Sequence, residues 1–242
     1  MGIESLVPAP LKNPYRRLRS ALKNRSLGTS NADIFDAVYR DALWGQSPEG
    51  DAYSGSGTYD PAAATYVAFV RSFITENKVR SIVEIGCGDF AIGRQYASDV
   101  DRYIGADVSN YIVARNVEKF GSEKISFVNL DASEHDLPAS DLCVVRQVLQ
   151  HLDNGSINRI LARVAAHKFV LITEHLPSPS RLRAPNLDKR SGPDTRLTFD
   201  SGVYIELPPF ERPVQTVLSL PVAEGQAHQG EVMRTTLLTN VC

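Results

Sequence analysis

Residues 81–107, SIVEIGCGDFAIGRQYASDVDRYIGAD, decide the fold. Their apolar start at residues 82–85 predicts a strand that is buried on both faces. Gly86 and Gly88 follow at once, where the chain must turn sharply and its backbone can approach a ligand closely. We expect a helix and a second strand next. Asp107 ends that strand, where its carboxylate can accept hydrogen bonds from both hydroxyls of a ribose. The segment therefore predicts a nucleoside pocket at the carboxyl ends of parallel strands.

Two kinds of nucleoside ligand fit this pattern. The spacing Gly86-x-Gly88-x-x-Ala91, with Asp107 about twenty residues on, also satisfies a dinucleotide fingerprint. Glu84 argues against a dinucleotide, because a carboxylate two residues before the first glycine would repel a pyrophosphate. It favours the ammonium of a methionyl group and suits a positive sulfonium.

With Glu84-Ile85-Gly86-Cys87-Gly88 as its first motif, the sequence resembles the class I S-adenosylmethionine-dependent methyltransferases over roughly residues 60–175. The resemblance implies S-adenosyl-L-methionine as the cofactor. In this family the residue that matches Asp131 accepts the adenine amino group, and the next backbone amide reaches the ring. The cofactor-binding residues that the resemblance implies are Glu84, Gly86, Cys87, Gly88, Asp107, Val108, Asp131, Ala132 and Gln147, with Ser54, Gly55 and Gly57 in a loop over the methionyl end.

Further apolar segments complete a predicted sheet. Strands are expected at residues 125–130, 141–145, 169–173, 215–220 and 232–241, and a helix with an apolar face at 61–78. This order predicts an α/β fold with a doubly wound, mostly parallel seven-stranded sheet and an antiparallel last strand, the Rossmann-like methyltransferase fold.

The chain divides into three predicted parts. Residues 1–30 form a basic N-terminal extension, residues 31–60 a helix and a Gly/Ser-rich loop that covers the cofactor, and residues 61–242 the methyltransferase domain. Within that domain, residues 176–201 are rich in proline and basic residues. They are expected to form an acceptor-side loop that grips phosphate or carboxylate, or else a solvated loop.

The N-terminal extension has an uneven charge. No acidic residue lies between Glu4 and Asp33, while this stretch holds six basic residues. Tyr15, Leu18 and Leu22 recur at helical spacing. Such a basic amphipathic helix suits a weak contact with an anionic surface, and a solvated terminus is the alternative.

Two histidines are candidates for catalysis. Transfer of a methyl group to an alcohol is helped by a base, and histidine is the natural candidate near neutral pH. His151 and His175 follow the fourth and fifth predicted strands, at the edge where acceptor and methyl group must meet. His151 acts as the base or contacts the acceptor, or instead has an orienting role toward backbone or cofactor, and His175 is the next candidate. Arg146 stands where a catechol-type metal site needs an aspartate, so no catalytic metal is expected.

The acceptor is inferred from likeness. Trp44-Gly45 and residues 54–57, 149–152 and 207–210 are similar to bacterial methyltransferases associated with polysaccharide and glycoconjugate assembly. This implies O-methylation of a sugar or glycan hydroxyl. The alternatives are a secondary-metabolite O- or N-methyltransferase, an NAD(P)-dependent oxidoreductase, and a non-catalytic nucleoside-binding module.

Composition limits the classes of binding partner and the cellular location that we expect for this protein. The 242 residues carry a net charge of −2, which gives no general attraction to nucleic acid. The three cysteines do not resemble a disulfide framework, and no apolar run predicts a membrane span or a signal peptide. We therefore expect a cytoplasmic enzyme acting on a small-molecule or saccharide acceptor. The sequence does not determine its oligomeric state.

Overall fold

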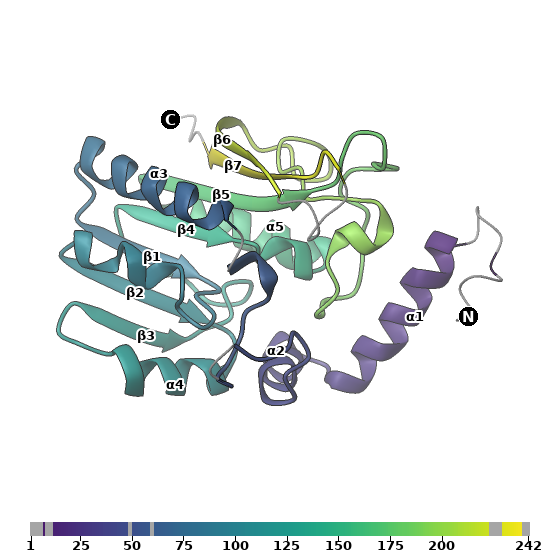
Figure 1. Cartoon of the computed structure of the whole chain (residues 1–242), viewed down its shortest axis with the longest axis horizontal. Coiled ribbons are helices and arrows are strands. Elements are labelled where there is room, and N and C mark those ends of the chain that lie inside the picture. The colour runs from purple at the N-terminus through teal and green to yellow at the C-terminus, as the bar shows by residue number, and fades with distance from the viewer. Residues whose placement is uncertain (1–6, 8–11, 48–49, 59–60, 223–228, 239–242) are drawn as a thin grey trace.

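The computed structural model describes residues 7, 12–47, 50–58, 61–222 and 229–238. Five α-helices and seven strands are found in these residues (Figure 1). The helices are α1 (Lys12–Leu27), α2 (Asn31–Arg40), α3 (Ala62–Glu76), α4 (Asn110–Phe120) and α5 (Asn154–Val164). The strands are β1 (Ser81–Ile85), β2 (Arg102–Asp107), β3 (Ile125–Asn129), β4 (Leu142–Arg146), β5 (Phe169–Leu176), β6 (Val214–Pro221) and β7 (Val232–Leu238).

The strands form one sheet in the order β3-β2-β1-β4-β5-β7-β6. Strands β1 to β5 pair in parallel, and β7 runs antiparallel to both of its neighbours. The predicted fold is confirmed, including the antiparallel last strand. That strand was predicted at residues 232–241, of which 239–241 lie outside the described residues. The strand order reverses between β1 and β4, which is where parallel α/β sheets bind their ligands.

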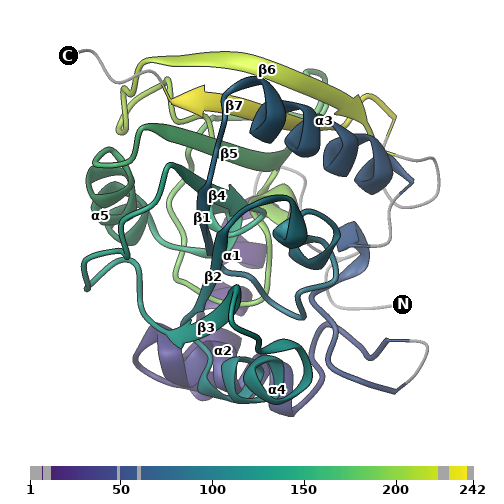
Figure 2. The ribbon, with the colours of Figure 1, turned by 90° about the vertical axis from the view of Figure 1, so that its left-hand side faces the viewer.

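Helices cover both faces of the sheet. Figure 2 shows α3 and α4 on one side and α5 on the other. Because side chains alternate along a strand, Ile82 packs in the apolar cluster that contains α3, and Val83 and Ile85 pack in the cluster that contains α5. Both faces of the central strands are therefore buried, as their continuous apolar sequence predicts.

The helix predicted between the first two strands does not form, so this prediction was wrong. Two short 3₁₀ turns, Gly93–Gln95 and Ala97–Asp99, stand in its place. Phe90 adopts a positive φ of 64° and is buried, as is Tyr96. These two aromatic side chains anchor the connection against the sheet. Because burial of these two side chains fixes the path of the backbone, this connection does not form a regular α-helix.

The N-terminal helix lies beside the segment predicted to face the acceptor, although the two are far apart in sequence (Figure 1). Arg17 Nη2 donates to the carbonyl oxygen of Asp188 at 2.8 Å, and Arg190 Nη2 donates to that of Gly28 at 3.0 Å. These contacts hold α1 beyond the carboxyl ends of the strands. No helix within the described ranges is long and apolar enough to cross a membrane.

Candidate active site

A cavity of about 520 Å³ opens at the carboxyl ends of the parallel strands. Every residue predicted for the site lines it, namely Glu84, Gly86, Cys87, Gly88, Asp107, Val108, Asp131, Ala132, Gln147, Ser54, Gly55, Gly57, His151 and His175. The structure therefore brings together side chains from most of the length of the chain. Parallel strands place their carboxyl ends at one edge, which explains how strand-end residues meet.

The glycine turn is closely packed. Gly86 and Gly88 have φ values of 65° and 54°, a backbone conformation that residues other than glycine rarely adopt. A Cβ atom on Gly86 would overlap the side chain of Val148, and one on Gly88 would overlap the hydroxyl of Ser54. Glycine is thus required here by both conformation and space.

Ser54 ties the Gly/Ser-rich loop to the glycine turn. Its backbone N–H donates to Asp89 Oδ2 at 3.0 Å, and the backbone N–H of Asp89 donates to Ser54 Oγ at 2.8 Å. Tyr39 Oη lies 3.1 Å from the same hydroxyl. These bonds hold the loop over the cavity. Sequence reasoning missed Asp89, although it directly follows the second glycine of the motif.

Glu84 is buried and held by two tyrosines. Tyr96 Oη and Tyr103 Oη donate to Glu84 Oε2 at 2.8 Å and 2.5 Å, and the residue is only 4% exposed. Burial raises the pKa of Glu84, although both tyrosine hydrogen bonds oppose that shift. Within the described part of the chain, both hydrogen bonds reach the same oxygen, so Oε1 keeps its capacity for a ligand. Neither tyrosine was predicted, because no sequence pattern shows where its hydroxyl points.

Asp107 is fixed by backbone groups. Its Oδ2 accepts from the N–H of Gly88 at 3.0 Å and its Oδ1 from the N–H of Ser109 at 2.9 Å. Burial raises the pKa of Asp107 to about 6. Each carboxylate oxygen can accept a second hydrogen bond, so both can still receive a ligand hydroxyl.

Asp131 lies at another part of the cavity wall. Its Oδ1 accepts from the N–H of Ser133 at 2.8 Å, and its Oδ2 accepts from Asn31 Nδ2 at 3.1 Å. Asn31 is the first residue of α2, so this bond joins the second predicted part of the chain to the sheet.

Charge distinguishes the candidate ligands. The ionisable acids that line the cavity are Glu84, Asp89, Asp107 and Asp131. Arg146 is the only arginine or lysine among the described lining residues. Such a surplus of carboxylates favours a ligand with positive charge and disfavours the pyrophosphate of a dinucleotide.

Arg146 itself was missed as a site residue. It ends β4, lines the cavity and donates from Nη2 to the carbonyl oxygen of Gly57 at 2.8 Å. Its guanidinium lies 5.1 Å from the centre of the Tyr66 ring. The next residue, Gln147, has a φ of 56°, and such strained conformations in residues other than glycine cluster at functional sites. The sequence signal that could have identified Arg146 as a site residue is its position at the end of a predicted strand.

The surroundings of the two candidate histidines differ. His151 is partly buried with its ring centre 5.1 Å from that of Trp44, and its Nδ1 has no hydrogen-bond partner among the described residues. Burial lowers the pKa of His151 to about 3, so it is neutral at physiological pH. His175 Nε2 lies 3.0 Å from Glu231 Oε2. Arg181 Nη1 contacts the other oxygen of Glu231 at 2.6 Å.

The turn that carries His151 is fixed by hydrogen bonds to the side chains of Glu174 and Lys189. Glu174 accepts from the backbone N–H of Leu149 at 2.9 Å and of Gln150 at 3.1 Å. Burial raises the pKa of Glu174 to about 8. Lys189 Nζ donates to the carbonyl oxygen of His151 at 2.8 Å. Glu174 was not predicted, since its role depends on a turn formed elsewhere in the chain.

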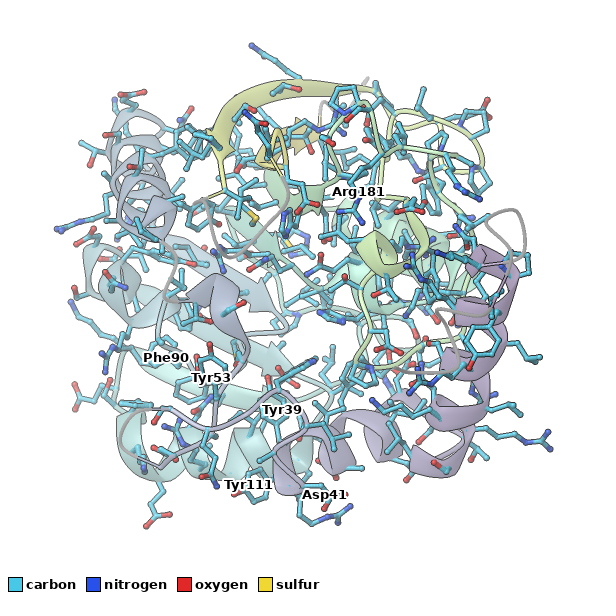
Figure 3. All side chains as sticks on the ribbon, turned by 45° about the vertical axis from the view of Figure 1, so that its right-hand side comes forward. Tyr39, Asp41, Tyr53, Phe90, Tyr111 and Arg181 are labelled. Carbon is cyan, nitrogen blue, oxygen red and sulfur yellow. The ribbon has the colours of Figure 1, made fainter. Side chains whose placement is uncertain are left out.

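Aromatic side chains form part of the cavity wall. Tyr39 is the last buried residue of α2, and Tyr53 lies in the loop that follows this helix. Both tyrosines line the cavity. Figure 3 shows these two tyrosines on one side of the strand ends and Arg181 on the other. In the part of the chain that the structure describes, no group of three or more His, Cys, Asp or Glu residues is arranged to hold a metal ion.

Comparison with known proteins defines the class. A family model described as a methyltransferase domain matches residues 82–167. The match shows a methyltransferase domain in this part of the chain, and together with the fold it supports an enzyme that uses S-adenosyl-L-methionine. The nicotinamide and non-catalytic alternatives are therefore set aside. A comparison with curated protein sequences finds no match.

Three solved structures share the fold. The chain is 17% identical to a 1,6-didemethyltoxoflavin-N1-methyltransferase of Burkholderia thailandensis (TM-score 0.56; 97% of this chain and 92% of that chain covered). It is 16% identical to the N-methyltransferase NodS of Bradyrhizobium japonicum (0.53; 74% and 88%). It is 12% identical to the magnesium protoporphyrin IX methyltransferase of Synechocystis (0.52; 86% and 97%). All three of those proteins were crystallised with S-adenosylhomocysteine.

Proposed function

We propose that this enzyme methylates a hydroxyl oxygen of a small polar acceptor, a sugar or glycan hydroxyl, and that His175 accepts the proton. The observation that carries the base assignment is the contact of His175, which lines the cavity, with the buried carboxylate of Glu231. A carboxylate beside an imidazole stabilises the imidazolium that forms when the base takes up a proton. The sugar assignment rests on the sequence likeness given above.

The described residues fit the cofactor. S-adenosyl-L-methionine supplies an activated methyl group on a positive sulfonium, so the protein's task is mainly to align the reactants. Glu84 would accept from the methionyl ammonium, and Arg146 would hold the methionyl carboxylate. Asp107 would accept from the ribose hydroxyls, and Asp131 from the adenine amino group. The surplus of carboxylates in the cavity supports this assignment, because the sulfonium and the ammonium are both positive.

His151 has a different role in this proposal. With its pKa lowered to about 3 by burial, it is a weak proton acceptor at neutral pH. Its ring packs against Trp44, and its backbone carbonyl accepts from Lys189. We assign it to the wall of the cavity, where it contacts cofactor or acceptor as a neutral ring.

A second candidate is methylation of a flat heteroaromatic acceptor. Tyr39, Trp44 and Tyr53 line the cavity, and such rings can stack on a planar ligand. The toxoflavin-type enzyme named above acts on a didemethyltoxoflavin and matches nearly the whole chain. A ring nitrogen with a free electron pair would need no base.

The test is an acceptor panel assayed with S-adenosylmethionine. Nucleotide sugars and oligosaccharides are compared with phenols and nitrogen heterocycles, by release of S-adenosylhomocysteine and by mass spectrometry of the product. We expect methylation of a sugar hydroxyl. In single-turnover assays, His175→Ala should slow transfer by about 10²–10⁴ and leave cofactor affinity within about threefold.

Two results would contradict the proposal. Methylation of heterocycles without any sugar would replace it with the second candidate. Full activity of His175→Ala on a sugar, with a large loss in His151→Ala, would move the base to the fourth strand.

A further inference from the structure

Helix α1 docks on the molecule through its polar side. Its buried residues are Asn13, Ser20 and Asn24. Ser20 Oγ donates to Asp194 Oδ2 at 2.7 Å, and Asn13 Nδ2 donates to the carbonyl oxygen of Phe199. Surface helices of globular proteins usually bury an apolar stripe and expose their polar face. This helix has the opposite orientation.

Leu18 and Leu22 of α1 face away from the protein, whereas Leu27 at the end of the helix packs against the core. Leu18 and Leu22 are each 62% exposed, more than any other large apolar side chain in the described ranges. They are four residues apart and so lie on the same face, one turn from each other. Arg19, Lys23 and Arg25 are exposed beside them. The helix sequence, KNPYRRLRSALKNRSL, contains no acidic residue.

We propose that this outer face of α1, formed by Leu18, Leu22, Arg19, Lys23 and Arg25, docks on an anionic lipid surface. Helices that lie in a membrane interface combine exposed leucines with flanking lysine and arginine in this way. The leucines would enter the acyl boundary, while the basic side chains contact anionic headgroups. The helix would lie on the membrane and not span it.

The charge of this face argues against a second copy of the chain as its partner. Two such faces packed together would bring their basic side chains into opposition with no acidic residue of α1 to pair with them. An anionic surface removes that conflict. Because α1 lies beyond the carboxyl ends of the strands (Figure 1), the lipid would lie on the same side of the molecule as the acceptor-side segment.

The proposal is tested by sedimentation of the full-length protein with vesicles. Vesicles of phosphatidylcholine alone are compared with vesicles containing about one third phosphatidylglycerol. We expect binding to the anionic vesicles that weakens as salt is raised, and little binding to the neutral ones. Neutralising two charges in Arg19→Gln/Lys23→Gln should weaken binding about 25-fold, at about fivefold for each basic residue.

The leucines are tested separately. Leu18→Ser/Leu22→Ser should weaken vesicle binding by about tenfold or more for each leucine. The matched control is Val117→Ser on α4, an exposed apolar residue (52%) away from this face, which should bind like the wild type. Both leucine side chains are exposed, so we expect Leu18→Ser/Leu22→Ser to bind S-adenosylhomocysteine like the wild type. This binding serves as the check on folding.

Three results would overturn the proposal. The first is that wild type fails to bind anionic vesicles. The second is that the leucine or charge variants bind as well as the wild type. The third is a dimer in sedimentation velocity that Leu18→Ser/Leu22→Ser dissociates, which would assign the face to a second copy of the chain. None of these results depends on the identity of the methyl acceptor.

Discussion

Protonation of Asp107 should control cofactor affinity. Burial raises the pKa of this carboxyl to about 6, and its two oxygens already accept from Gly88 and Ser109. The ribose hydroxyls proposed to bind here prefer a charged acceptor. At about pH 5, one unit below the pKa, about nine in ten unliganded molecules carry the proton. The apparent Kd of S-adenosylhomocysteine should then be about tenfold larger than at about pH 8.

The same shift has a consequence for stability. The pKa of Asp107 is higher in the folded chain than the ordinary value of 3.8, so the folded chain binds this proton more tightly than the unfolded one. The contribution of this group to the unfolding free energy therefore falls as pH rises from about 4 to about 6, by about 3 kcal/mol. Bound cofactor should reduce that loss, because its hydroxyls stabilise the charged form.

Titration calorimetry of S-adenosylhomocysteine across this pH range is the assay. Asp107→Asn should remove the part of the pH dependence that Asp107 contributes and weaken binding at about pH 8 by about ten- to hundredfold. The matched control is Asp101→Asn, the same change at the amino end of β2, where the carboxylate is exposed and pairs with Arg80. A wild-type Kd that stays constant across the range, or an Asp107→Asn variant with wild-type affinity, would refute the reasoning.

Three further predictions concern the groups around the cavity. In Gly93→Ala, the new Cβ would lie 2.6 Å from Glu84 Oε2, so cofactor binding should weaken about tenfold or more, as a thermal shift assay with S-adenosylhomocysteine can measure. Ser54→Ala removes the acceptor for the Asp89 N–H and should speed cofactor release about fivefold in stopped-flow measurements. Glu174→Gln should be more stable relative to the wild type at about pH 8 than at about pH 5, because the raised pKa of this acid makes its charged form costly as pH rises; urea unfolding at both values checks this.

Much of the candidate site could be predicted because it depends on local order in the sequence. Glu84, Gly86 and Asp107 lie at the ends of short apolar strands, and parallel strands bring those ends to one edge. Gly88 was predictable for a similar reason, since its positive φ is a backbone requirement. Roles that depend on long-range contacts were harder to predict. Nothing near Tyr103 in the sequence shows that its hydroxyl reaches Glu84.

The sequence by itself determined the fold class, the class of cofactor and many of the residues that line the cavity, because apolar periodicity and glycine turns act over short stretches of chain. Only the tertiary structure decided the rest. It replaced the helix after the glycine turn with 3₁₀ turns, because Phe90 and Tyr96 are buried beside the sheet. It also left Leu18 and Leu22 of α1 exposed. The periodicity that predicts an amphipathic helix does not reveal which face docks, since that depends on partners such as Asp194 and Phe199, far away in sequence.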